Sequence, residues 1–151
     1  MSSDLQPSHL SVQAAEDVDA MSYAPHRGLS RRALRLATTY INDHLGDPVR
    51  LQDLAQAAGI SRFHFARLFR ISTGESPMEY LLRARIERAQ SILLTTERRM
   101  SDVATSLGFC DQSHFSRSFR RYVGMTPRQF AVNAGVPTSV AVAFEALEAQ
   151  V

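Results

Sequence analysis

Cysteine, lysine and long apolar runs are scarce or missing in this sequence of 151 residues, and each absence excludes a class of protein. Cys110 is the only cysteine, so neither an intrachain disulfide nor a cysteine-based zinc cluster can form. A lone thiol most often serves as a small apolar side chain, and we expect that role here. No apolar stretch approaches the ~18 residues that a membrane-spanning helix needs.

The N-terminal residues and the motifs that the sequence lacks bear on the location of the protein and on enzyme activity. Residues 1–20, MSSDLQPSHLSVQAAEDVDA, have no basic start and no apolar block, so they do not form a secretory signal and we expect a cytoplasmic protein. The sequence has neither a glycine-rich phosphate loop nor an HExxH zinc motif, and its Cys-x-x-x-His spacing is not that of a recognised nucleophile pair. We therefore expect no enzyme activity, no cofactor and no bound metal.

Basic charge comes from arginine alone, and it is concentrated in the middle of the chain. Residues 27–130 carry all 17 arginines against nine acidic residues, whereas residues 1–26 carry four acids and residues 131–151 carry two. A basic body between acidic ends indicates a polyanionic partner, although the same surplus also fits an ordinary solvated surface. The arrangement of the arginines must decide between the two.

Apolar residues at helical spacing, together with helix caps, predict an all-α chain of about seven helices. The clearest caps are two capping boxes, Ser76 with Glu79 and Thr126 with Gln129, each with a proline at the first helical position. Ser61 is expected to cap the helix that follows it. The predicted parts are a disordered acidic tail (1–29), a first helix-turn-helix subdomain (30–75), a linker helix (76–96), a second helix-turn-helix subdomain (97–133) and a C-terminal tail with the spacing of a short amphipathic helix (134–151).

The second subdomain repeats the first about 50 residues later: HFARLFR at 64–70 returns as HFSRSFRR at 114–121. Gly59 aligns with Gly108 at an offset of 49, whereas everything from the repeated histidine onward aligns at an offset of 50. The extra residue falls in the second turn, near Cys110, where an insertion is best tolerated. Each unit is a short helix, a turn with glycine and a longer helix, which is the helix-turn-helix arrangement.

The longer helix of each unit, at about 62–73 and 112–123, has two faces. The inner face is aromatic-rich and is expected to be core, whereas the outer face combines small side chains with arginine. Arginine occupies the same outer position in both units, from which it can reach a guanine edge in the major groove; the alternative is a merely solvated charge. The inner faces comprise Phe65, Leu68 and Phe69, and Phe115, Ser118, Phe119 and Tyr122; the outer faces comprise Phe63, Ala66, Arg67 and Arg70, and Ser113, Ser116, Arg117 and Arg120.

The doubled pattern, LAQAAGISRFHFARLFRISTGESPMEYL and VATSLGFCDQSHFSRSFRRYVGMTPRQF, resembles the DNA-binding domain of the AraC/XylS family of bacterial transcription regulators. The resemblance covers roughly residues 30–133, and the second segment is a near-complete family signature. It implies seven helices in two helix-turn-helix subdomains joined by one long helix, with both recognition helices in successive major-groove segments of double-stranded DNA. Such a protein would be associated with the nucleoid.

The resemblance also implies which side chains contact DNA. The base-reading candidates are Phe63, Ala66 and Arg67 in the first unit, and Gln112, Ser113, Ser116 and Arg117 in the second. The phosphate-contacting candidates are Arg62, Arg70 and Arg120, with His114, which could touch a base or a phosphate. For His64 and His114 we expect packing or hydrogen bonding rather than metal binding. Since Ala66 cannot hydrogen-bond a base, the first unit is expected to depend on Arg67, and on Phe63 touching a thymine methyl group.

Partners and assembly follow from the same resemblance. Besides DNA, RNA polymerase is a candidate partner. The 30 residues before the domain are too few for a separate sensor domain, so we expect a stand-alone regulator that acts as a monomer on DNA, or else a fragment of a longer protein. Two alternatives stay open: a helical protein-interaction module that holds RNA polymerase or another regulator, and a regulator that binds a small-molecule ligand.

Overall fold

The computed structural model describes residues 28–96 and 98–135, and these residues form seven helices and no strand. The all-α prediction is therefore confirmed, while the expectations for the two tails lie almost wholly outside the described residues. No described helix is both long and apolar enough to cross a membrane. The helices are α1 (Arg31–Asp43), α2 (Leu51–Ala57), α3 (Arg62–Thr73), α4 (Pro77–Thr95), α5 (Met100–Ser106), α6 (Gln112–Val123) and α7 (Pro127–Asn133).

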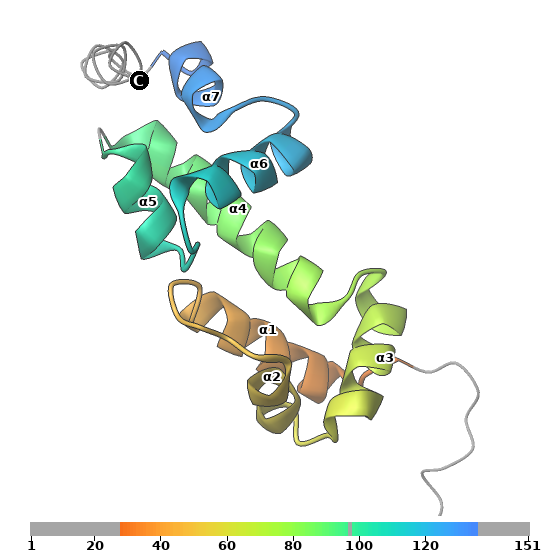
Figure 1. Ribbon diagram of the computed structural model, residues 1–151. Helices are drawn as coiled ribbons and strands as arrows, with labels where there is room; N and C mark the ends of the chain where they lie inside the picture. Colours follow the sequence, from red (N-terminus) through yellow and green to blue (C-terminus); the bar gives the residue numbers. More distant parts are fainter. Residues whose placement is uncertain (1–27, 97, 136–151) are drawn as a thin grey trace, which may run out of the picture.

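Helix α4 runs through the middle of the molecule and completes two separate small cores. Figure 1 shows α1, α2 and α3 around one end of α4 and α5, α6 and α7 around the other, so that the two halves follow one another along it. Leu81 and Ala84 of α4 enter the first core, with residues of α1, α2 and α3. Ile86, Ala89 and Leu93 enter the second, with residues of α5 and α6. The predicted linker helix is therefore also part of both cores.

The repeat in the sequence is a repeat of backbone geometry. Gly59 and Gly108, in the turns of the two helix-turn-helix units, have the same positive φ of 70°. In each turn the residue after the glycine donates its N–H to a carbonyl of the preceding short helix, Ile60 to Ala55 at 3.0 Å and Phe109 to Ala104 at 3.1 Å. The insertion therefore lies after this shared turn and leaves its geometry unchanged.

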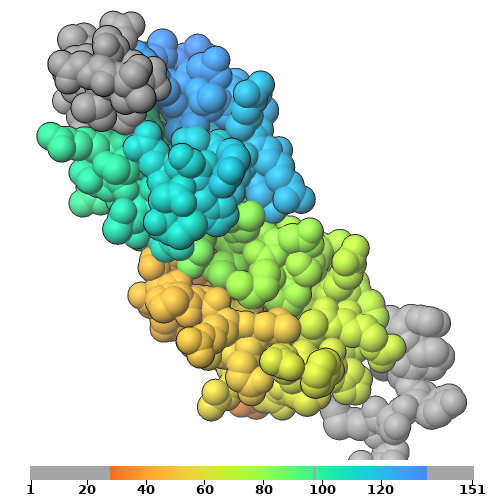
Figure 2. Space-filling model, in the orientation of Figure 1, coloured from red at the N-terminus to blue at the C-terminus, as the bar shows by residue number. Residues whose placement is uncertain are grey.

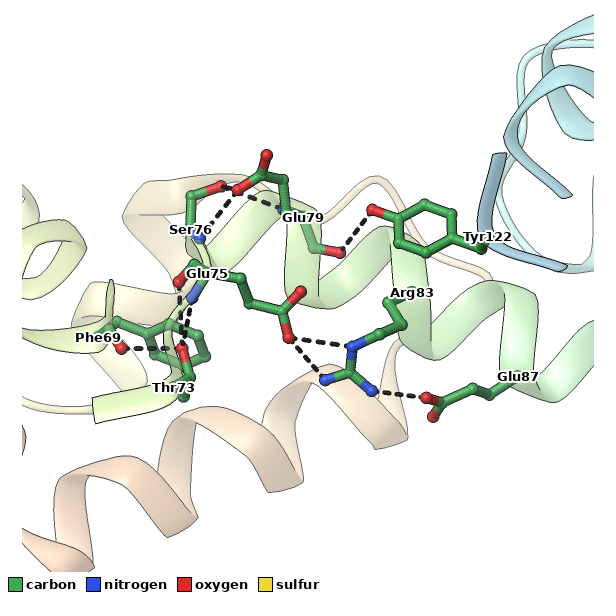
Figure 3. A network of polar contacts seen from close by, with 8 residues as sticks. All are labelled: Phe69, Thr73, Glu75, Ser76, Glu79, Arg83, Glu87 and Tyr122. Atoms are coloured by element: carbon green, nitrogen blue, oxygen red, sulfur yellow. Dashed lines mark hydrogen bonds and ion pairs between the residues drawn. The ribbon is translucent and has the colours of Figure 1, made fainter. Parts of the chain in front are cut away.

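A polar network ties the end of α3 to the start of α4 (Figure 3). The predicted capping box is present: the Ser76 hydroxyl accepts from the Glu79 N–H at 3.3 Å, and the Glu79 carboxylate accepts from the Ser76 N–H at 3.0 Å. Arg83 bridges the Glu75 and Glu87 carboxylates, and the hydrogen bonds to Glu75 contribute most to raising the pKa of Arg83. The link to α3 is its last residue, Thr73, whose hydroxyl donates to the Glu75 carbonyl at 3.0 Å. The second predicted capping box, at the start of α7, is formed as well.

The two halves of the molecule also touch directly, through two turns that contain glycine. A Cβ atom at Gly46, in the turn after α1, would lie 2.7 Å from the Ser106 carbonyl oxygen. A Cβ atom at Gly108 would lie 2.7 Å from Nη2 of Arg85 and 3.0 Å from the Gly46 carbonyl oxygen. Both glycines therefore allow a close approach, and a side chain at either position would force neighbouring atoms to shift.

Gly108→Ala is expected to destabilise the protein more than Gly59→Ala does. Both positions share the same positive φ, so both variants incur the left-handed strain of roughly 1–2 kcal/mol. Only at Gly108 does the new methyl group meet other atoms, because nothing lies within 4 Å of a Cβ at Gly59. Thermal unfolding of the two variants measures the difference. Equal losses of stability would contradict the close contact between the halves.

Candidate nucleic-acid interface

Helix α3 buries its phenylalanines and leaves its arginines in solvent. Phe65 and Phe69 have no exposed surface, and their rings pack 5.4 Å apart, as the inner face predicts. On the outer face Phe63 is 80% exposed, which is unusual for a large apolar side chain. The predicted contact residues Arg62, Ala66, Arg67 and Arg70 lie on the same helix, with the three arginines exposed and Ala66 half-buried.

The guanidinium of Arg62 lies over the ring of Phe63, with its carbon 4.9 Å from the ring centroid. Such a cation–π contact covers one face of an otherwise exposed aromatic ring. It also places a positive charge beside the apolar tip of the helix. A positive charge and an exposed apolar ring therefore lie on adjacent residues at the start of α3.

Helix α6 repeats this division between its two faces. Phe115 and Phe119 have no exposed surface, and Ser118 between them is also buried, which confirms the predicted inner face. The predicted contact residues of α6 lie on its other face: Ser113, Arg117 and Arg120 are exposed, and Gln112, His114 and Ser116 are half-buried. Small, half-buried side chains next to exposed arginines leave room for the helix to approach a surface closely. The forked guanidinium can donate two parallel hydrogen bonds to a base edge or a phosphate.

The start of α6 carries a cap that the sequence interpretation missed. The Asp111 carboxylate accepts from the His114 N–H at 2.6 Å, and this bond is the largest cause of the lowered pKa of Asp111. An aspartate directly before a helix is a known capping signal, so the sequence contained it. Ser61 occupies the same position before α3, but its side chain makes no capping hydrogen bond, contrary to expectation.

Cys110 lies at the surface, so the expectation that it packs as a small apolar side chain is wrong. The cause is the extra residue in the second turn, where Phe109 is buried and Cys110 is left outside. Its Sγ atom lies 3.3 Å from Nδ1 of His114, whose ring packs against Phe109 with centroids 5.3 Å apart. The prediction that His114 packs and hydrogen-bonds thus agrees with its surroundings. Among the described residues, no three His, Cys, Asp or Glu side chains are placed to hold a metal ion.

Helices α3 and α6 both contribute to one face of the molecule. In the space-filling view, residues of α6 (cyan) and of α3 (yellow-green) both appear at the surface, α6 in the upper half and α3 in the lower half (Figure 2). The halves are arranged end to end, so the two helices follow one another along the long direction of the molecule. The geometry suits an elongated partner that can be contacted at two places.

Comparisons with known proteins agree with this arrangement. A family model described as a helix-turn-helix domain matches residues 54–132. The probable transcriptional regulator LumQ of Photobacterium leiognathi is 32% identical over 102 residues, which cover 68% of this chain and 41% of LumQ. The regulatory protein SoxS of Escherichia coli is 34% identical over 91 residues, which cover 60% of this chain and 85% of SoxS. This chain thus spans less than half of the first relative and most of the second.

Solved structures show the same fold. A transcriptional regulator from Chromobacterium violaceum, described as containing an AraC-type DNA-binding domain, has a TM-score of 0.66 at 28% identity, covering 70% of this chain and 94% of that one. The DNA-binding domain of AdpA, solved in complex with a target DNA, has a TM-score of 0.63 at 30% identity, covering 67% of this chain and 91% of that domain.

Asp111→Ala is expected to lower the thermal stability at neutral pH more than Ser61→Ala does, because only Asp111 makes a capping bond from its side chain. The folded-state pKa of Asp111 lies below its ordinary value of 3.8, so this contribution is present above about 3.8 and is lost as the pH falls through the lower folded value. The deficit of Asp111→Ala should therefore shrink in acid. A deficit that stays constant down to pH values well below 3.8 would show that the carboxylate is not its cause.

Proposed function

This chain belongs to the AraC-type family of helix-turn-helix transcription regulators, and on that premise we propose that it binds double-stranded DNA sequence-specifically through α3 and α6 together. The observation that carries the proposal is the doubled arrangement of faces. In both helices the inner-face phenylalanines, Phe65 and Phe69 of α3 and Phe115 and Phe119 of α6, are buried, while Arg67 and Arg117 are exposed at equivalent positions. The chain would act by binding alone, without a catalytic step.

Base reading falls to the outer faces near the start of each helix. Arg67 and Arg117 would each donate a bidentate pair to O6 and N7 of a guanine, which is the commonest specific contact in the major groove. The exposed ring of Phe63 suits a thymine methyl group, while Ala66 offers only its small size. In α6 the polar side chains of Gln112, Ser113 and Ser116 add hydrogen-bonding capacity that α3 lacks, so the two helices would read different bases.

The remaining candidate contact residues of α3 and α6 are suited to the DNA backbone. Arg62, Arg70 and Arg120 carry charge on the outer faces, and His114 lies at the start of α6. Contacts of this kind fix the register of a protein on the duplex without reading its sequence. They also make affinity depend on salt, because each neutralised phosphate releases counterions.

A single chain with two reading helices can bind an asymmetric site as a monomer. The helices would need to enter the major groove about one turn apart, roughly 34 Å. A duplex that bends toward the protein could meet both, at a deformation cost on the order of 1–6 kcal/mol that the additional contacts offset. The surface left free of DNA would then be available to RNA polymerase. The solved complex of the related AdpA domain with its target DNA supports DNA as the partner.

Arg67→Ala and Arg117→Ala are each expected to weaken binding by about 1–3 kcal/mol and to relax the preference at particular base pairs. Arg70→Ala and Arg120→Ala should instead weaken binding to all sequences and lower the salt slope by about one each. The measurement is selection from a random-sequence duplex pool, followed by titrations at two salt concentrations.

The same titrations separate the rival functions. If the double variant Arg67→Ala, Arg117→Ala selects the wild-type site with wild-type affinity, the base-reading assignment is wrong. If the wild-type chain shows no salt-dependent binding to any duplex, the protein-interaction module is favoured. If binding appears only after a small molecule is added, the ligand-sensing alternative is favoured.

A further inference from the structure

Arg85 lies in the middle of α4, between the residues that enter the first core and those that enter the second. Its guanidinium donates to backbone carbonyls on both sides. Nε donates to Leu45 at 2.8 Å and Nη2 to Asp47 at 2.7 Å, both in the turn after α1. Nη1 donates to Gly108 at 3.1 Å, in the turn between α5 and α6. One planar side chain is therefore bonded to both halves of the molecule.

This arrangement is held by geometry rather than by an opposite charge. The three acceptors of Arg85 are main-chain oxygens, whereas Arg83, two residues earlier on α4, pairs with the carboxylates of Glu75 and Glu87. Burial lowers the pKa of Arg85, whereas the nearby charge of Asp47 raises it. A guanidinium stays protonated in proteins and offers five donors in a fixed plane, so it can hold three carbonyls in set directions.

The turns that Arg85 joins lead directly to the recognition helices. Gly108 is followed by Phe109, whose ring packs against Phe115 of α6 with centroids 5.2 Å apart. On the other side, the turn after α1 leads into α2, and α2 is the short helix against which α3 packs. The two turns and the guanidinium are in close contact: a Cβ at Gly108 would lie 3.0 Å from the Gly46 carbonyl oxygen of the other turn and 2.7 Å from Nη2 of Arg85.

We propose that Arg85 is a positioning residue that fixes the orientation of α3 relative to α6, and thereby sets the spacing between the two groups of base pairs that the chain can read at once. The proposal rests on the proposed two-helix binding mode. It assigns a role in DNA selectivity to a residue that lies outside the two recognition helices. Its contacts with both turns would keep the two halves from rotating about α4 independently.

The variant that tests this is Arg85→Lys, with Arg88→Lys as its matched control. Both changes keep the positive charge and the helix, so electrostatic attraction to DNA is unchanged. A single ammonium cannot reach carbonyls that three separate guanidinium nitrogens reach now. Arg88, three residues further along α4, is exposed. Thermal unfolding confirms that each variant is folded at the temperature of measurement.

The first measurement needs no DNA. Spin labels at Gln52 and Thr105, exposed on α2 and α5, would report the distance between the halves in a full chain that also carries Cys110→Ser. Double electron–electron resonance should give one narrow distance distribution for the labelled protein that keeps Arg85 and for its Arg88→Lys variant. The Arg85→Lys variant should give a broadened distribution. Identical distributions in all three proteins would overturn the proposal.

The second measurement moves the two half-sites of the selected DNA one base pair closer together or further apart. The wild type and Arg88→Lys should lose about tenfold or more in affinity on either change, as for a lost base contact. Arg85→Lys should bind the original site more weakly than the wild type does. Its affinities for the three spacings should differ by less than about threefold, which is below the cost of one lost base contact. A merely structural role would weaken binding at every spacing by the same factor, and that result would overturn the proposal. If the wild type binds no duplex, the proposed function fails, and the distance distributions alone decide the role of Arg85.

Discussion

The fold depends on one helix completing two cores that are each too small to stand alone. Helical units of about 40 residues rarely bury enough apolar surface for independent stability. In this chain the first unit needs Leu81 and Ala84, and the second needs Ile86, Ala89 and Leu93, all from α4. Because the same helix satisfies both needs, α3 and α6 are attached to a common axis. Their separation is therefore a consequence of core packing.

Within this shared frame the two units are alike in the backbone and different at the surface. The turn glycines have the same φ, and each recognition helix buries a pair of phenylalanines. The extra residue of the second unit lies between the glycine turn and the start of α6, where it leaves the geometry of that turn unchanged. It exposes Cys110 and brings in Asp111 as the cap. The two units thus share the buried phenylalanines and the exposed arginines, and they differ in the small outer residues, as Ala66 against Ser116, and in the turn before the longer helix.

Much of this could be predicted from the sequence because the responsible signals are local. Capping boxes act over three residues and helix faces over four, so Ser76, Thr126 and the buried phenylalanines were identifiable. The role of Arg85 was not, because it lies on the same stripe of α4 as core residues and its acceptors are 23 to 40 residues away. Periodicity gives the face of a residue but not its partner across the fold. The contacts of the outer faces with DNA stay predictions, since they depend on a partner that the chain alone does not contain.

The choice of acceptors around Arg85 has a consequence for how such a protein can diversify. Its three hydrogen bonds end on main-chain oxygens, which every residue type supplies. The side chains at 45 and 47 can therefore change without loss of the acceptors. The residues that must be kept for this contact between the halves are Arg85 and the glycine at 108. New binding preferences can then arise by surface substitution in α3 or α6 alone, with the alignment between them inherited unchanged.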